Sequence, residues 1–449
     1  MQLKVKAGGI RRQLIAASCA LLGAAEGRAQ EAQTSDAGTA AAPGLTLDSA
    51  LGYYQESGGR IRAIEPIVTV QQVQDNGDIW GLNLTFDSLS GSSPNGALTS
   101  NKPQTFATPS GASLKGVPQT YTTASGQSQT VNAPIYSVAA GTLPVDSNYK
   151  DQRLAGALSW NHSLSRLTSL TLGGKLSYEH DFISGSFSAL VAHDFNQKNT
   201  TLSLGVNGEF DSLHPIGGAP APGTDYALFQ KTGAKTKQGA GVVLGLTQVM
   251  APRWVSEFNL SADRFSGYLD DPYKIISVLD ATGATTGYLY EKRPDSRLRR
   301  SAYLENRWGW ERASVALSLR YMNDDWQVHS STAQFRVRFW NSPKDRYLEP
   351  TVRWYQQSAA QFYAPWLSSS AAQLTYASAD SRLAALSAWT YGLKYAVKYG
   401  DDSDASELSV RLELYRQTQA DRLAAPPALQ GLNLYPGLQA LMLQIGWRY

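Results

Sequence analysis

Residue types that bind metal ions or perform catalysis come together at two places in this sequence. Residues 179–181 read Glu-His-Asp, but neighbouring side chains of a strand point to opposite faces, so we expect that the three cannot converge on an ion. Asp402 and Asp404 resemble the start of a calcium loop, whose sixth position requires glycine but is Glu407 here. No H-E-x-x-H, G-x-S-x-G, Walker A or C-x-x-C motif occurs. We therefore expect no enzyme, no metal site and no cofactor.

Charged side chains also recur at every second position of several segments, as Arg336 and Arg338 do on either side of Val337. On strands that cross a membrane the apolar side must face lipid, because a lysine or arginine at the bilayer centre costs about 2–4 kcal/mol. The charged side then lines the lumen, as an ion-selective pore or as a salt-bridge network that stiffens the wall; the sequence leaves both open. The predicted lumen-lining residues are Glu257, Asp263, Glu305, Arg320, Arg336, Arg338, Arg353, Arg411 and Glu413.

The elements that carry these residues are segments of 10–15 residues in which apolar and polar side chains alternate, a strand signal. The predicted strands are residues 47–56, 61–74, 78–90, 149–162, 167–181, 183–196, 200–213, 236–249, 254–268, 296–310, 313–326, 327–340, 347–361, 381–398, 406–418 and 437–449. Every second connection is short, and all the long ones (91–148, 214–235, 269–295, 362–380 and 419–436) fall in the other set. Short turns at one end and long loops at the other predict an all-β fold, a transmembrane antiparallel up-and-down β-barrel of about sixteen strands.

The first residues carry an export signal. Four basic residues precede an apolar stretch from Leu14 to Ala25, and Gly27-Arg28-Ala29 ends it, so we expect a signal peptide at 1–29, a linker at 30–46 and the barrel at 47–449. Without residues 1–29 the chain is nearly neutral, which excludes a polycation for nucleic acid. No later stretch approaches the length of an apolar membrane helix.

The last strand has its own pattern. Leu441, Leu443, Ile445 and Trp447 share one face, and the chain ends at Tyr449, which resembles the signal read by the outer-membrane assembly machinery. The alternative is an ordinary edge strand. Tryptophans near predicted strand ends suggest aromatic girdles at the membrane interfaces. These are Trp80, Trp254, Trp308, Trp310, Trp326, Trp340 and Trp447.

Five short motifs, taken in order, resemble the Gram-negative outer-membrane barrel family known as domain of unknown function 3570. They lie at 87–91, 267–274, 321–326, 355–363 and 378–383. The resemblance covers about residues 47–449 and implies an exported barrel with no established activity. It also implies an association of some members with extracytoplasmic flavin-linked redox components.

In the predicted topology all these motifs lie at strand ends on the long-loop side. They predict a site at the external mouth formed by Asp271, Lys274, Asp324, Asp325, Gln357, Asp380 and Arg382. The alternative is that these residues anchor loops and form part of the aromatic belt.

Two functions remain open from the sequence. The first is an outer-membrane channel or solute-binding barrel, since about sixteen strands leave room for an aqueous lumen. The second is a scaffold with a plugged lumen that holds a periplasmic redox partner or a lipoprotein. Both place the protein in the outer membrane, in contact with its lipid, with Tyr449 presented to the assembly machinery.

Overall fold

The structure is a computed structural model that describes residues 44–107, 119–122, 128–131, 135–228, 231–369, 375–400, 406–420 and 422–449. The predicted signal peptide, most of the predicted linker, and Asp402 and Asp404 of the calcium-loop resemblance lie outside these residues. No helix among the described residues is long and apolar enough to cross a membrane.

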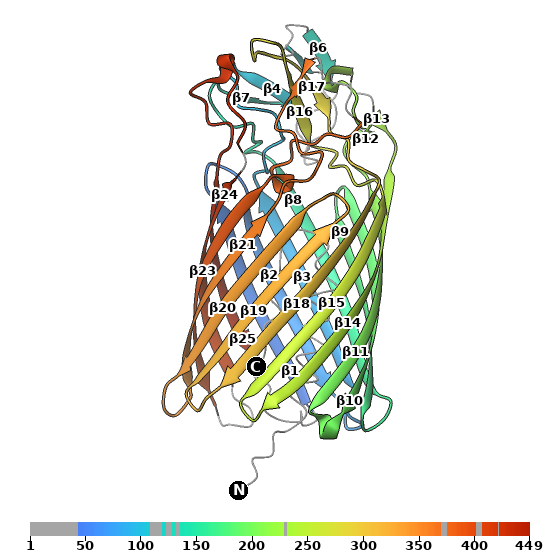
Figure 1. The fold of residues 1–449 in the computed structure, drawn as a ribbon, viewed down its shortest axis with the longest axis vertical. Helices are drawn as coiled ribbons and strands as arrows, with labels where there is room; N and C mark the ends of the chain where they lie inside the picture. Colours follow the sequence, from blue (N-terminus) through green and yellow to red (C-terminus); the bar gives the residue numbers. More distant parts are fainter. Residues whose placement is uncertain are drawn as a thin grey trace.

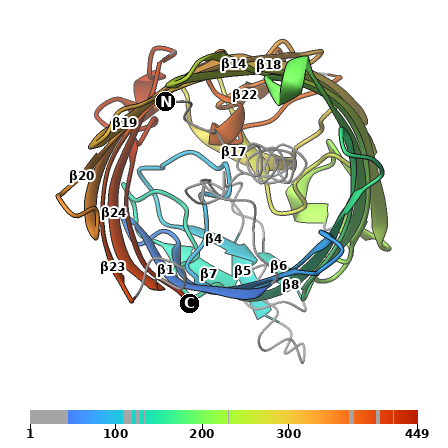
Figure 2. The ribbon, with the colours of Figure 1, turned by 90° about the horizontal axis from the view of Figure 1, so that it is seen from below.

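Sixteen antiparallel strands form one closed barrel, with β1 paired to β25 (Figures 1 and 2). In chain order they are β1 (Gly44–Glu56), β2 (Arg62–Val73), β3 (Ile79–Ser90), β8 (Lys150–Ser163), β9 (Thr168–Glu179), β10 (Phe182–Phe195), β11 (Thr200–Leu213), β14 (Lys235–Ala251), β15 (Trp254–Gly267), β18 (Ser296–Gly309), β19 (Ala313–Asp324), β20 (His329–Trp340), β21 (Arg346–Gln357), β23 (Leu386–Tyr399), β24 (Ser406–Gln419) and β25 (Leu438–Arg448). The up-and-down order and the strand number predicted from the alternation are confirmed.

Some strand ends differ from the predicted ones. β1 begins at Gly44, within the segment predicted as linker, because the alternation continues there with exposed Leu45 and Leu47. β21 ends at Gln357 and β23 begins at Leu386, so the segment between them is longer than predicted. Residues 381–383, predicted as the start of the strand, form a short 3-10 helix that Asp380 caps by accepting a hydrogen bond from the Arg382 backbone N–H.

The outer face of the barrel is apolar. In β24, Leu408, Val410, Leu412 and Leu414 are 42–54% exposed, whereas Ser409 between them is 8% exposed. Exposing so many leucine and valine side chains to water is unfavourable, whereas exposing them to the hydrocarbon of a bilayer is not. The pleat therefore turns the leucines and valines outward and the polar residues into the lumen.

Most of the predicted tryptophans lie at the end of the barrel that carries the short turns. There Trp80 stacks on Trp160 at 5.9 Å and Trp254 on Trp308 at 6.1 Å, measured between ring centroids. The prediction that Trp326 belongs to an aromatic girdle at a membrane interface was wrong. This side chain is 3% exposed and packs against Phe362, 5.0 Å away, beneath the long loops.

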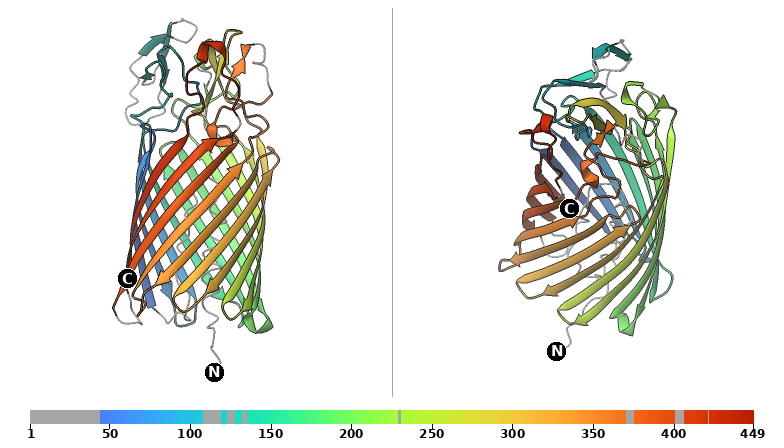
Figure 3. Two further views of the ribbon diagram at one scale, coloured as in Figure 1. Left: turned by 60° about the vertical axis from the view of Figure 1, so that its left-hand side comes forward. Right: turned by 45° about the horizontal axis from the view of Figure 1, so that its top comes forward.

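Five long loops connect the strands at the opposite end of the barrel, and their described residues form what we call the cap (Figures 1 and 3). The loops are residues 91–149, 214–234, 268–295, 358–385 and 420–437. Short strands within the cap are β4 (Gln104–Ala107), β5 (Gln119–Thr122), β6 (Ser128–Val131), β7 (Ile135–Val138), β12 (Ala219–Pro220), β13 (Lys231–Thr232), β16 (Ile275–Leu279), β17 (Thr285–Tyr290) and β22 (Leu367–Ser368).

Candidate functional sites: the capped mouth and the charged lumen

The cap is built around β16, all of whose residues are buried. β16 pairs with β17 and β22, and loop 91–149 joins it through the Leu98 backbone N–H, which donates to Ser277 Oγ at 3.0 Å. Clusters of buried apolar residues around β16 combine all five loops. Their members include Ala97, Leu98, Phe106, Tyr226, Ile275, Ile276, Leu279, Tyr288, Tyr290, Leu367, Ala377, Ala379 and Leu429. The five loops therefore fold as one unit over the mouth.

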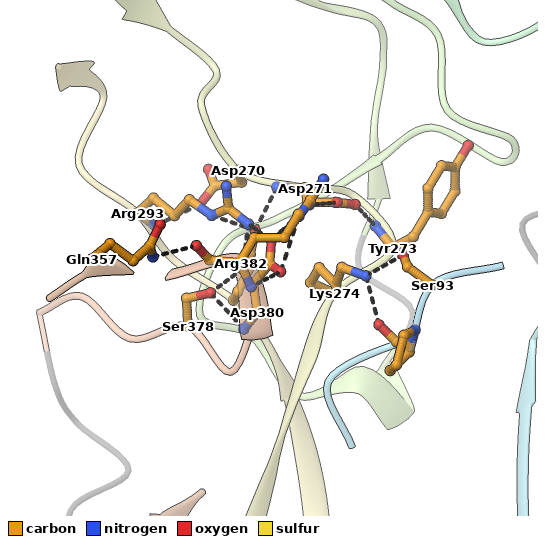
Figure 4. A network of polar contacts seen from close by, with 12 residues as sticks. Ser93, Asp270, Asp271, Tyr273, Lys274, Arg293, Gln357, Ser378, Asp380 and Arg382 are labelled. Carbon is orange, nitrogen blue, oxygen red and sulfur yellow. Dashed lines mark hydrogen bonds and ion pairs between the residues drawn. The ribbon is translucent and has the colours of Figure 1, made fainter. Parts of the chain in front are cut away.

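A charged network joins two of these loops beside the clusters (Figure 4). Arg382 donates to Asp380 and Asp271, in each case with a shortest distance of 2.6 Å. Burial opposes ionisation of both carboxyl groups, but the neighbouring cations, with Arg382 and Lys274 foremost, outweigh it and hold both pKa values below the usual range. The network thus consists of ionised pairs that cross from loop 268–295 to loop 358–385.

Two residues of this network were not predicted from the sequence. Glu291 is 2% exposed and accepts hydrogen bonds from the Asp271 backbone N–H and from Ser378 Oγ, both at 2.5 Å. Arg293 lies between Glu291 and Asp380, at 2.7 Å and 2.8 Å. A charged run at 291–295, directly before β18, was the available signal.

Lys274 connects the network to a third loop. It is 4% exposed, and its Nζ donates to Ser93 Oγ at 2.9 Å and to the Pro94 carbonyl at 2.6 Å. Burial lowers the pKa of Lys274, and the nearby carboxylates, Asp271 first, oppose that shift. The predicted mouth residues Asp271, Lys274, Asp380 and Arg382 therefore lie together.

The other three predicted mouth residues hold strand ends, and of these Gln357 touches the network, at the backbone of Arg382 (Figure 4). Gln357 Nε2 donates to the carbonyls of Arg382 and Ala384, which fixes loop 358–385 on β21. Asp324 pairs with Arg297 of β18 at 2.5 Å, and Asp325 accepts from the Leu298 N–H at 3.0 Å. At these three positions the side chains anchor loops and strand ends, which is the alternative role considered from the sequence.

A group of carboxylates does gather near the mouth, although not the group considered from the sequence. Oxygens of Asp151, Glu179 and Asp181 lie within 4.8 Å of one another, so two members of the 179–181 run converge with a partner from β8. His180 is not a member of this group, in agreement with the expectation that the three residues of the run cannot converge, since Glu179 and Asp181 lie on one side and His180 on the other. Tyr273 donates a hydrogen bond to Asp181.

The lumen-lining candidates from the sequence occupy inward positions on six strands, β15, β18, β19, β20, β21 and β24, and are buried or half-buried. Glu257 accepts from Asn259 at 2.8 Å, and Asp263 faces Arg299 and Arg320. Glu305 pairs with Arg307 on the same strand. These acids therefore have basic or amide neighbours in the wall.

Arg338 and Arg411 also belong to ion pairs of the wall. Arg338 Nε lies 2.6 Å from Glu349, which also lies 3.7 Å from Arg411. Arg411 lies 3.3 Å from Glu413. Glu349 is 2% exposed and was not predicted as a lumen residue, although it occupies an inward position two residues from Thr351. At these positions the charges of the wall are paired with one another.

Arg320, Arg336 and Arg353 differ from these. They lie on the adjacent strands β19, β20 and β21 and point inward. Among the described residues, none of the three has a carboxylate oxygen within 4.0 Å. Arg320 lies near Arg353, which repels it, and near Asp263, which attracts it from beyond ion-pair distance. Glu305 stands in the same relation to Arg336. Inside the barrel, three guanidinium groups are thus left without direct acidic partners.

The closed sixteen-strand barrel, its apolar outer face and its charged interior define an outer-membrane-type β-barrel protein. The chain belongs to the family described as "Protein of unknown function (DUF3570)", which matches residues 11–449 and agrees with the motif resemblance. No curated protein matches the chain.

Solved structures of outer-membrane proteins are similar to this chain at low identity. Pseudomonas aeruginosa OccD3 (OpdP) is 10% identical, with a TM-score of 0.42 over 90% of each chain. Pseudomonas aeruginosa OccK2 (OpdF) in complex with glucuronate is 11% identical, with a TM-score of 0.39 over 90% of this chain and 97% of that one. A bacterial polysaccharide outer membrane secretin is 10% identical, with a TM-score of 0.39 over 90% and 98%. The proposals below rest on this chain's own residues.

Proposed function

We propose that the protein is an outer-membrane channel for small anionic solutes, with its external mouth covered by the cap. The outer-membrane location is supported by the apolar outer face, by the tryptophans at the short-turn end and by the segregation of long loops to the other end. We place the short turns on the periplasmic side, together with the start of β1 at Gly44 and the end of β25 at Arg448.

The observation that carries the proposal is the set of unpaired inward arginines, Arg320, Arg336 and Arg353. A wall that served only to stiffen the barrel would pair its charges, as Arg338 and Arg411 are paired with Glu349. The three side chains are half-buried, and a guanidinium group without a carboxylate partner needs water or a counter-ion to compensate its charge, because an uncompensated charge removed from water costs several kcal/mol. Three such charges on adjacent strands favour a hydrated path that attracts anions.

The charges of the cap do not compete with this path. Within the cap the three acids Asp271, Asp380 and Glu291 face the three bases Lys274, Arg293 and Arg382. The network therefore holds the loops in place, and the selectivity lies in the barrel wall below. In this function Arg320 and Arg353 bind and orient the passing anion, and no covalent chemistry is required.

Planar-bilayer recordings test the proposal. The purified barrel should conduct and prefer chloride over potassium, and Arg320→Glu combined with Arg353→Glu should remove or reverse that preference. Arg338 is unsuitable for this purpose, because its substitution would break the ion pair with Glu349.

The matched control is Arg62→Glu with Arg416→Glu, since these two exposed arginines point outward from β2 and β24. It makes the same change in net charge and should keep the wild-type selectivity. Unchanged selectivity in the lumen variant, or an equal change in the control, would contradict the anion channel.

The second candidate is a scaffold for an extracytoplasmic redox partner or a lipoprotein, with a closed lumen. The interlocking of five loops through β16 favours it, because a solute must pass that cap. Absence of conductance from the folded barrel, both intact and with loop 268–295 shortened, would favour the scaffold. Conductance that appears only after shortening would instead identify the cap as the gate of a channel.

A further inference from the structure

The outer surface carries two arginines on adjacent strands near the cap. Arg264 of β15 and Arg300 of β18 both point outward and are exposed. Ala262 is paired with Arg300 and Arg264 with Leu298, so the two arginines are diagonal neighbours on one face. Such neighbours lie about 7–8 Å apart at Cα, which lets two guanidinium groups contact one ligand.

Neither arginine is neutralised by the protein. No carboxylate oxygen of the described residues lies within 4.0 Å of Arg264 or Arg300. Asp325, on the neighbouring strand end, accepts a hydrogen bond from the Leu298 N–H. Further donors flank the pair, since Asn323 is paired with both Arg300 and His329. The side chains of this patch are therefore suited to an anionic ligand with several oxygens.

The height of the patch relative to the bilayer follows from the strand geometry. Arg264 is ten residues from Trp254 on β15, and Trp254 lies at the periplasmic end. At about 3.4 Å per residue and a tilt of about 40°, ten residues rise by about 25 Å along the barrel axis, which equals the height of the apolar band. The two arginines therefore lie at the outer head-group level, where their charge is tolerated.

Directly below the arginines the surface is suited to acyl chains. Phe258, Leu260 and Leu319 on β15 and β19 are 39%, 44% and 46% exposed on the outer face. A ligand that satisfies both regions is amphiphilic, with an anionic head at the arginines and hydrocarbon along the barrel. Two other ligands fit less well. A free anion would contact only the arginines and not the apolar surface below them, and a soluble protein could not contact the surface that lies in the bilayer.

We propose that Arg264 and Arg300 form a binding site for a phosphorylated lipid head group of the outer leaflet. Guanidinium groups bind phosphate with paired N–H donors, and two of them match a doubly charged phosphomonoester. Asn323 and His329 provide further hydrogen bonds to the sugar or phosphate oxygens of the head group. The site rests on the outer-membrane placement proposed above and is independent of whether the lumen conducts.

Native mass spectrometry of the purified barrel tests the site, with lipid A as the probe and phosphatidylglycerol as the comparison lipid. The wild type should retain lipid A in preference to phosphatidylglycerol. Arg264→Gln with Arg300→Gln should weaken lipid A retention at least about tenfold. The control Arg62→Gln with Arg416→Gln removes two outward arginines on other strands and should retain lipid A as the wild type does.

Each alternative result overturns the site. Equal retention of phosphatidylglycerol would show attraction to any anionic lipid, and equal loss in the control would show a general effect of surface charge. Retention by the double variant would show that the two arginines are not the ligands. A heat-dependent gel shift establishes that every variant is a folded barrel, so a failed lipid site is distinguished from a failed barrel or channel proposal.

Discussion

At the residue scale, identical side chains two positions apart on β20 differ because of the strand beside them. Both Arg336 and Arg338 point into the lumen, but only Arg338 has an acid of β21 at 2.6 Å, namely Glu349. Arg336 is paired in register with Thr351, which leaves its charge available. Pairing across strands, which the sequence of one strand does not contain, decides whether an inward arginine stiffens the wall or attracts a solute.

A pH dependence of the cap also belongs to the residue scale. Asp270 accepts a hydrogen bond from the Arg293 backbone N–H at 2.6 Å, and burial raises its pKa to about 6, against the opposing charges of Arg293 and Lys292. Because the folded cap holds this proton more tightly than the unfolded chain, the stabilisation is full below about pH 4 and is lost as the pH rises through 6. The lowered pKa of Asp271 acts only at more acidic pH.

We therefore expect that hydrogen-exchange protection of the β16 amides falls by about tenfold between pH 4.5 and 7, after correction for intrinsic exchange. Asp270→Asn should reduce this pH dependence and leave only the part due to Glu291, whose pKa burial raises to about 7. A similar pH dependence in the variant would assign the effect to another group of the cap.

At the scale of elements, β25 closes the barrel, and its last residues make the closing contacts. The backbones of Tyr449 and Leu47 exchange two hydrogen bonds of 2.8 Å and 2.9 Å, and Arg448 pairs with Asp48 at 2.6 Å. Trp447 is 47% exposed on the lipid face. The C-terminal segment thus contributes both to closure and to the outer aromatic surface.

Removal of residues 447–449 should strongly reduce the amount of assembled barrel and leave export intact, because the closing contacts and the terminal aromatic residue are lost. The yield of heat-modifiable protein in the outer membrane measures assembly. Arg448→Gln, which removes only the ion pair with Asp48, serves as the control and should assemble nearly normally. Normal yield from the truncation would show that the terminal aromatic residue is incidental.

At the scale of the whole molecule, the protein should fractionate with outer membranes and migrate faster on gels when it is not heated. A closed barrel resists unfolding by detergent because each strand is hydrogen-bonded to a neighbour on both sides and no strand edge is free. Recovery in the soluble periplasmic fraction, with no difference between heated and unheated samples, would contradict the outer-membrane placement.

The sequence alone determined the barrel, because alternation and loop length are properties of single segments and of their order along the chain. It indicated sixteen strands, the end that carries the long loops and the inward side of each strand. It also predicted that Asp271, Lys274, Asp380 and Arg382 lie at the mouth, since the topology places the ends of their strands on one side.

Only the tertiary structure decided which of these residues meet. Glu291 and Arg293 enter the cap network, and Trp326 is buried beneath the cap, because five loops distant in sequence pack around β16. Likewise, Glu349 neutralises Arg338 while Arg320 is left without a direct acidic partner. The physical reason is that strand periodicity fixes the direction of a side chain, whereas its partner depends on inter-strand register and loop packing, which are set by contacts between distant parts of the chain.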